Sequence, residues 1–246
     1  MKRVLNWRPD LPDQRDHMYT PAKWWWWLPK RVDLRGDCSP IEDQGPLGSC
    51  TGNAIASAIE ILQLKQDQEL TDISRLFIYY NERAYINEVR NDSGAYIRDG
   101  IKSIRKIGAA KEALWPYHIE KFAERPNEAS YADALTRRFR SYERINSLTG
   151  MLNCLAEGYP FVFGFTVYSG FMSDEVARTG KVSMPGPNEY EMGGHAGLAV
   201  GYDRKRRHFI VRNSWGVEWG DKGYFTMPFD YLADRNLSDD LWTVRG

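Results

Sequence analysis

Cys50 follows a turn-rich stretch and opens a helical pattern, and this position favours a reactive thiol. The stretch from Gln44 to Thr51 reads QGPLGSCT, and its Gly and Pro residues break regular structure just before the cysteine. Apolar residues then recur with helical spacing. Unpaired N–H groups and the dipole at a helix N-terminus favour a thiolate, which is a strong nucleophile. Because a lone cysteine is more often a small buried apolar residue, a nucleophile also needs a base and a group that orients the base.

His195 is the histidine best placed to be that base. It follows a Gly-Gly pair and enters an apolar strand, where a titratable ring needs a polar partner. The remaining histidines lie in irregular or basic stretches: His17, His118 and His208. Asn213 follows 18 residues later, at the end of a predicted strand. Its amide can hold the imidazole in one tautomer while Trp215 shields the contact, so the three residues would act as nucleophile, base and orienter.

The elements that must position these residues change type along the chain. Helices are predicted at about 50–66, 74–83 and 97–108, with a short linking helix at 128–140. Strands are predicted at 161–168, 196–202, 208–212 and 224–227, separated by Gly-, Pro- and Asp-rich turns. Helices followed by antiparallel strands predict an α+β fold, with two lobes and a cleft between them.

Composition and charge exclude several classes. In 246 residues, 42% are hydrophobic, which supports a packed core rather than disorder. Lys+Arg and Asp+Glu both total 33, so no basic excess points to nucleic acid. No apolar run approaches the roughly 18 residues of a membrane span. The cysteines and histidines lack zinc-site spacing, so we expect neither a metal nor a cofactor.

Three cysteines are too few for a disulfide framework in a chain of this size. A Cys38–Cys154 bridge would leave Cys50 free, and the sequence does not decide whether it forms. The first residues contain no signal-peptide core, so a reducing cytoplasm is expected, although a removed leader would leave the same sequence.

Residues 1–30 are predicted to form an extended N-terminal arm, because Pro, Asp, Arg and Trp interrupt any regular pattern. Trp24 to Trp27 are consecutive. Alternate rings could pack on the body of the protein, the arm could cover a groove and block a site, or the tryptophans could touch a membrane surface. We predict that the arm associates with the cleft, so that deleting residues 1–28 changes the apparent KM or the rate.

These residues resemble the papain-like cysteine peptidases, the C1 family, over about residues 31–230. The matching segments read DQGPLGSC, GGHAGLAVGYD and VRNSWGVEWGDKGYF. The 145 residues from Cys50 to His195 lie within the family range of roughly 130–150, and the 163 to Asn213 lie slightly beyond it. The family usually has Cys and Trp where this chain has Leu47 and Thr51. Its long helical propeptide is missing, and the start resembles that of intracellular bacterial members.

The resemblance implies a catalytic domain at 31–246, with a helical lobe at about 45–135 and an antiparallel β-barrel-like lobe at about 136–246. It implies a cysteine endopeptidase that hydrolyses peptide or protein substrates. Cys50 would attack the scissile carbonyl, His195 would form an ion pair with it, and Asn213 would orient His195. The Gln44 amide and the Cys50 N–H would hold the oxyanion. The residues implied to lie along the substrate are Gly94, Ala95, Ile97, Gly164, Gly194, Ala196 and Trp215.

Two alternatives keep the peptide-binding cleft but change its use. The same thioester could pass its acyl group to an amine, as in a peptide ligase, if water were excluded. The chain could also be a catalytically silent module that grips peptides. Products formed with added amines distinguish the first alternative, and a Cys50→Ala variant distinguishes the second.

Overall fold

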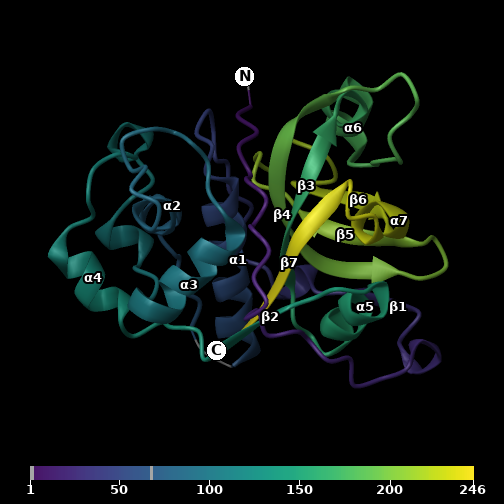
Figure 1. Ribbon diagram of the computed structural model, residues 1–246, viewed down its shortest axis with the longest axis horizontal. Coiled ribbons are helices and arrows are strands. Elements are labelled where there is room, and N and C mark those ends of the chain that lie inside the picture. Colours follow the sequence, from purple (N-terminus) through teal and green to yellow (C-terminus); the bar gives the residue numbers. More distant parts are fainter. Residues whose placement is uncertain (1–2, 67–68) are drawn as a thin grey trace.

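The α-helices of the first half of the chain and the sheet lie on opposite sides of the computed structural model, which describes residues 3–66 and 69–246 (Figure 1). The helical side consists of α1 (Cys50–Lys65), α2 (Arg75–Ala84), α3 (Ile97–Ile107) and α4 (Glu128–Ala134). The other side carries an antiparallel sheet ordered β2-β7-β3-β4-β5-β6, with β1 paired to β4. Its strands are β1 (Arg31–Asp33), β2 (Ser141–Arg144), β3 (Phe161–Tyr168), β4 (Glu191–Asp203), β5 (His208–Arg212), β6 (Tyr224–Pro228) and β7 (Ser238–Arg245). The predicted α+β two-lobe fold is confirmed.

Helix α1 is the central element of the helical side. Its residues from Cys50 to Gln63 are all buried, because the helix packs between α2 and α3 on one side and β4 on the other. A helix that is buried all round carries apolar or small residues on every face instead of along one stripe, and the Ala, Ile and Leu residues of α1 are distributed in this way. The predicted start of α2 and the predicted end of α3 are confirmed. The Ser74 side chain caps α2 by accepting a hydrogen bond from the Phe77 N–H, and Gly108 ends α3 with a φ of 85°.

Several elements differ from the sequence-based prediction. The predicted helix at 128–140 stops at Ala134. Strand β4 begins at Glu191, five residues before the predicted start, so His195 lies inside the strand. Strands β1, β2 and β7 were not predicted, nor were the helices α5 (Leu148–Ala156), α6 (Asp174–Thr179) and α7 (Phe229–Ala233). Strand β7 starts with a Ser-Asp-Asp run, which has no apolar alternation to reveal it.

All three cysteines are free in the structure, so the possible Cys38–Cys154 bridge is not formed. Within residues 3–66 and 69–246, no helix is long and apolar enough to cross a membrane.

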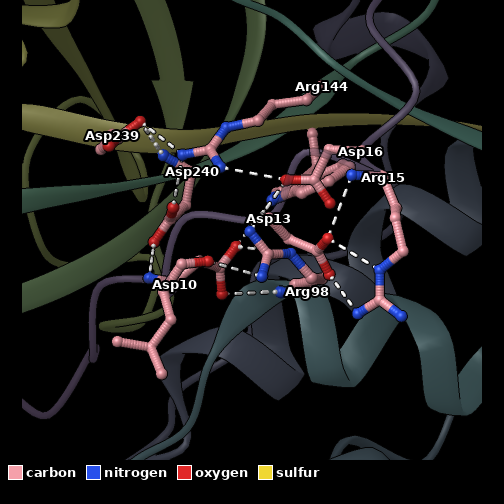
Figure 2. Close-up of polar contacts among 10 residues, drawn as sticks. Asp10, Asp13, Arg15, Asp16, Arg98, Arg144, Asp239 and Asp240 are labelled. Carbon is pink, nitrogen blue, oxygen red and sulfur yellow. Dashed lines mark hydrogen bonds and ion pairs between the residues drawn. The ribbon is translucent and has the colours of Figure 1, made fainter.

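The N-terminal arm runs between the two sides of the molecule, where its start descends in purple past α1 (Figure 1). A buried ionic cluster anchors it further along, and Figure 2 shows how its members converge. The Asp10 carboxylate accepts hydrogen bonds from the Trp242 indole at 2.9 Å and from the Arg98 backbone N–H at 3.2 Å. Asp16 pairs with Arg98 at 2.8 Å and with Arg144 at 3.2 Å. Because Arg98 belongs to α3 and Arg144 to β2, the arm is tied to both lobes.

Asp240 is a second buried carboxyl group in this cluster. It accepts a hydrogen bond from the Asp10 backbone N–H at 2.7 Å and pairs with Arg144 at 3.0 Å. Burial, reinforced by the nearby Asp10 carboxylate, raises the pKa of Asp240 to about 8, against about 3.9 in an unfolded chain. Burial also raises the pKa of Asp10. Folding therefore favours the protonated forms of Asp10 and Asp240.

We predict that Asp240→Asn weakens the pH dependence of stability. A carboxyl group whose pKa rises on folding stabilises the fold fully below about pH 4, and this stabilisation is lost as the pH rises through about 8. The amide resembles the protonated acid, so the free energy of unfolding should fall less steeply across that window than in the wild type. Urea unfolding across the window measures this. Asp230→Asn, at an exposed ion pair with Arg207, is the control, and an unchanged slope in Asp240→Asn would contradict the prediction.

Candidate active site

Cys50 is the first residue of α1, and its side chain is fully buried. Gly45, with a φ of 62°, makes the turn that leads to it. The thiol lies against the backbone N–H groups of Thr51 and of Ala196 in β4, which favour the thiolate. The N–H groups in the first turn of a helix have no partner four residues earlier, so this helix start can hold negative charge. The predicted position of Cys50 at a helix N-terminus is therefore what the structure has.

His195 and Asn213 lie in direct contact. The imidazole Nε2 is 2.8 Å from the Asn213 Oδ1, and both side chains are buried. The Trp215 ring lies with its centroid 4.8 Å from that of His195, which covers the pair. The other imidazole nitrogen, Nδ1, has no partner among the described residues, which leaves it available to a neighbouring group. Since Ala196 touches the thiol and follows His195 in β4, the ring and Cys50 belong to one site.

Gln44 is held rigidly beside them. Its side-chain Nε2 donates to the Leu47 carbonyl at 2.8 Å, and its Oε1 accepts from the Ser214 hydroxyl at 2.7 Å. An amide nitrogen carries two N–H groups, so one remains for another acceptor. Sequence reasoning missed Ser214, which directly follows Asn213 and also fixes the Gln44 backbone N–H at 2.8 Å. Its adjacency to Asn213 was the only local signal.

Burial sets the protonation of the site in this structure. It raises the pKa of Cys50 to about 12, against the neighbouring backbone N–H groups that lower it. It lowers the pKa of His195 to about 4, and the positive charge of Arg3 lowers it further, while the bond to Asn213 opposes the shift. Burial therefore favours the neutral thiol and the neutral imidazole while the site is covered.

The N-terminal arm contributes to this burial, because its backbone pairs with both lobes beside Cys50 and His195. Asn6 and Trp7 form parallel bridges with Gly194 and Ala95 respectively. The Trp7 N–H donates to the Gly194 carbonyl at 3.0 Å, and the Arg8 N–H donates to the Ala95 carbonyl at 3.1 Å. Gly194 precedes His195 in β4, whereas Ala95 lies just before α3. An extended segment of the chain itself is thus bound beside the candidate nucleophile and base.

The residues implied to lie along a substrate are largely those that hold this segment. A Cβ built on Gly164 would lie 1.9 Å from the Trp7 ring, and one on Gly194 would lie 2.6 Å from the Trp7 carbonyl oxygen. Gly94, with a φ of 72°, packs equally closely on Asn6. Ile97 and Ala196 are buried in the same apolar cluster as Trp7, and Trp215 lies on His195 instead.

Trp24 to Trp27 do not take part in this contact. Trp25 is half-buried under Arg204, at 4.7 Å from its ring, while Trp24, Trp26 and Trp27 are exposed. The interpretation that alternate rings pack on the body is therefore wrong for Trp27. Arg3, which sequence reasoning did not single out, donates to the Trp215 carbonyl at 2.9 Å and pairs with Asp43.

Comparison with known proteins agrees with this geometry. Residues 28–236 match the papain family cysteine protease profile. The chain belongs to the papain family of cysteine proteases. A peptidase C1-like protein of Acanthamoeba polyphaga mimivirus, described as uncharacterized, is 46% identical over 89% of this chain and 73% of its own. Cysteine proteinase 1 of Entamoeba histolytica is 30% identical over 87% of this chain and 68% of its own.

Among solved structures, xylellain, a cysteine protease from Xylella fastidiosa, superposes on this papain-family chain with a TM-score of 0.92. It is 40% identical, and the match covers 98% of this chain and 95% of xylellain. The predicted resemblance to the bacterial members of the family is confirmed, as is the enzyme class, a cysteine endopeptidase.

Proposed function

We propose that this papain-family protein cleaves peptide bonds by using Cys50 as nucleophile, His195 as acid and base, and Asn213 as the residue that orients His195. The observation that carries the proposal is the buried 2.8 Å contact between His195 and Asn213, beside the thiol at the start of α1. The unpartnered Nδ1 of His195 is the atom that would exchange a proton with the Cys50 thiol.

Each step follows from those positions. His195 takes the thiol proton, and the Cys50 sulfur attacks the carbonyl carbon of the scissile bond. The resulting oxyanion is held by the free N–H of the Gln44 amide and by the Cys50 backbone N–H. The imidazolium then gives its proton to the departing amine, which leaves a thioester on Cys50. Water, deprotonated by His195, hydrolyses the thioester and restores the enzyme.

We also propose that the arm keeps this site closed until it is displaced. Cys50 and His195 are fully buried while the arm is bound, so a substrate cannot reach them. Trp7 is 8% exposed and fits where Gly164 and Gly194 leave room for it. Arg3 adds an electrostatic effect, because its charge disfavours the imidazolium that pairs with a thiolate. Release of the arm would admit both substrate and water, and would favour the reactive ion pair.

The test uses a broad library of fluorogenic peptides and the thiol-directed inhibitor E-64, with the intact chain and with the arm-destabilised Trp7→Ala variant. The proposal expects hydrolysis, and labelling by E-64 at Cys50, at least in the variant. If neither protein cleaves any peptide and neither is labelled, the proposal of peptidase activity fails. Added amines in the same reactions show whether acyl transfer competes with hydrolysis.

Replacing Asn213 by alanine should lower kcat by about 10- to 100-fold and change KM little. Leaving the buried imidazole nitrogen without its partner costs about 1–3 kcal/mol, and each 1.4 kcal/mol is tenfold in rate. Without it the imidazole loses one fixed orientation, although the substrate still binds. Steady-state kinetics in the Trp7→Ala background measure the two constants separately. Asn146→Ala, at an exposed site, is the matched control, and an equal effect on kcat in the two variants would count against the role of Asn213.

A further inference from the structure

Three tryptophan rings project from the arm at a point remote from the candidate active site. They belong to the 3₁₀ turn η1 (Trp25–Trp27) and to Trp24, which precedes it. Trp24, Trp26 and Trp27 are 70%, 68% and 72% exposed. The turn lies at the outer edge of the molecule, beside β1, where it is dark purple in Figure 1. Large apolar rings gathered at an exposed site usually mark a surface that meets a partner.

The turn is held firmly, although its rings are exposed. On one side, the Lys23 N–H donates to the Asn153 Oδ1 at 2.8 Å, and the Asn153 amide donates back to the Lys23 carbonyl at 2.9 Å. On the other side, Leu28 is buried and its carbonyl accepts from Arg204 at 2.8 Å. Trp24 and Trp26 stack with centroids 5.6 Å apart and planes 5° from parallel. The rings are therefore presented in a fixed arrangement, and a partner need not order the segment on binding.

Basic side chains gather around the turn, although the whole chain has a formal net charge of zero. Lys23 and Lys30 are exposed on either side of it, and the Arg204 backbone N–H bonds to the Lys30 carbonyl at 2.9 Å. Arg204 begins the basic turn between β4 and β5, and Lys205 and Arg206 follow it in that turn. Among the residues that the structure describes, none of these five cations has a carboxylate within ion-pair distance.

We propose that Trp24, Trp26 and Trp27, together with Lys23 and Lys30, form a docking surface for an anionic lipid membrane. Indole rings favour the boundary between headgroups and acyl chains, and neighbouring basic side chains attract anionic headgroups. The exposed rings are part of a turn at the molecular edge, so they can enter a flat surface together. A single-stranded nucleic acid is less favoured, because it requires a basic groove with separated stacking platforms, and here two of the rings already stack on each other.

Membrane binding does not depend on peptidase activity. The experiment can therefore use the Cys50→Ala protein, which cannot cleave itself through this thiol. Sedimentation with phosphatidylcholine vesicles, with and without about 30% phosphatidylserine, measures binding. We expect binding to the anionic vesicles that weakens with added salt. The triple change Trp24→Ser, Trp26→Ser and Trp27→Ser should weaken it about tenfold or more. Lys23→Glu with Lys30→Glu should remove the preference for phosphatidylserine.

Tyr190→Ser is the matched control, because Tyr190 is 65% exposed outside this surface, and it should bind as the parent does. Absence of vesicle binding would overturn the proposal. So would binding that survives the triple tryptophan change, or an equal loss in the tyrosine control. Binding of a single-stranded RNA oligonucleotide without vesicle binding, or a dimer that the triple change dissociates, would assign the surface to another partner.

Discussion

The Trp7→Ala protein should hydrolyse peptides faster than the wild type, with kcat/KM higher by up to about 100-fold. Trp7 is 8% exposed, and truncating a buried tryptophan to alanine costs about 3–5 kcal/mol. Here the substitution mainly destabilises the closed form, in which the arm covers the site. The measured kcat/KM is the intrinsic value multiplied by the fraction of molecules whose site is open. Because each 1.4 kcal/mol is tenfold in that fraction, the gain continues until the arm is mostly displaced.

Gly164→Val tests release of the arm from the opposite side of the contact, and limited proteolysis measures it, because Gly164 is also among the residues implied to lie along the substrate. The three atoms closest to a Cβ at this position all belong to Trp7, so the added side chain should displace the arm without disturbing β3. Trp26→Ala is the control for Trp7, since that ring is 68% exposed in the same arm, and Gly36→Val is the control for Gly164. A Cβ on Gly36 would have no atom within 4 Å. Unchanged kcat/KM in a folded Trp7→Ala protein, with the arm shown to be released by limited proteolysis, would rule out arm-mediated closure.

The boundaries of β3 and β5 could be predicted from sequence to the residue. Each is an apolar run bounded by turn residues, and local pattern alone determines such elements. Cys50 at the start of α1 was predictable for the same reason. The early start of β4 was not, because Gly193 and Gly194 read as a break. Glycine is tolerated there because the arm backbone comes so close that a side chain on Gly194 would meet the Trp7 carbonyl oxygen.

Long-range contacts explain the remaining differences. The Trp24–Trp27 run is the most conspicuous pattern in the arm. The residues of the arm that pair with the two lobes at the site are instead Asn6, Trp7 and Arg8. Nothing local distinguishes these three residues, since their partners lie at Ala95 and Gly194. Asp240 is similar: an aspartate in an acidic run predicts an exposed turn, but Arg144 and the Asp10 backbone bury it. Such burial depends on partners about 100 and 230 residues away, which no window of the sequence contains.

Replacing Cys50 by alanine in the Trp7→Ala background should lower kcat by on the order of 10⁶-fold, the loss that follows removal of a protease nucleophile. Without the sulfur no thioester forms, and His195 has no nucleophile to activate in the first step. The substitution removes only the sulfur atom and leaves the rest of the cleft in place, so peptides should still bind with little change in affinity. Steady-state hydrolysis and peptide-binding measurements on the same variants separate the two effects. A silent binding module would instead show no activity before the substitution.

Cys38→Ala is the matched control, because that thiol is also free but lies outside the site and contacts the Leu34 carbonyl. It should keep its activity and its labelling by E-64, whereas Cys50→Ala should lose both. The thermal stability of the two variants shows whether either loss reflects unfolding. If Cys50→Ala retained hydrolysis above that of a buffer blank, the nucleophile would have to be another group. Cys154 could not replace it without rearrangement, because its buried sulfur faces the Thr243 hydroxyl at 3.0 Å, inside the β lobe.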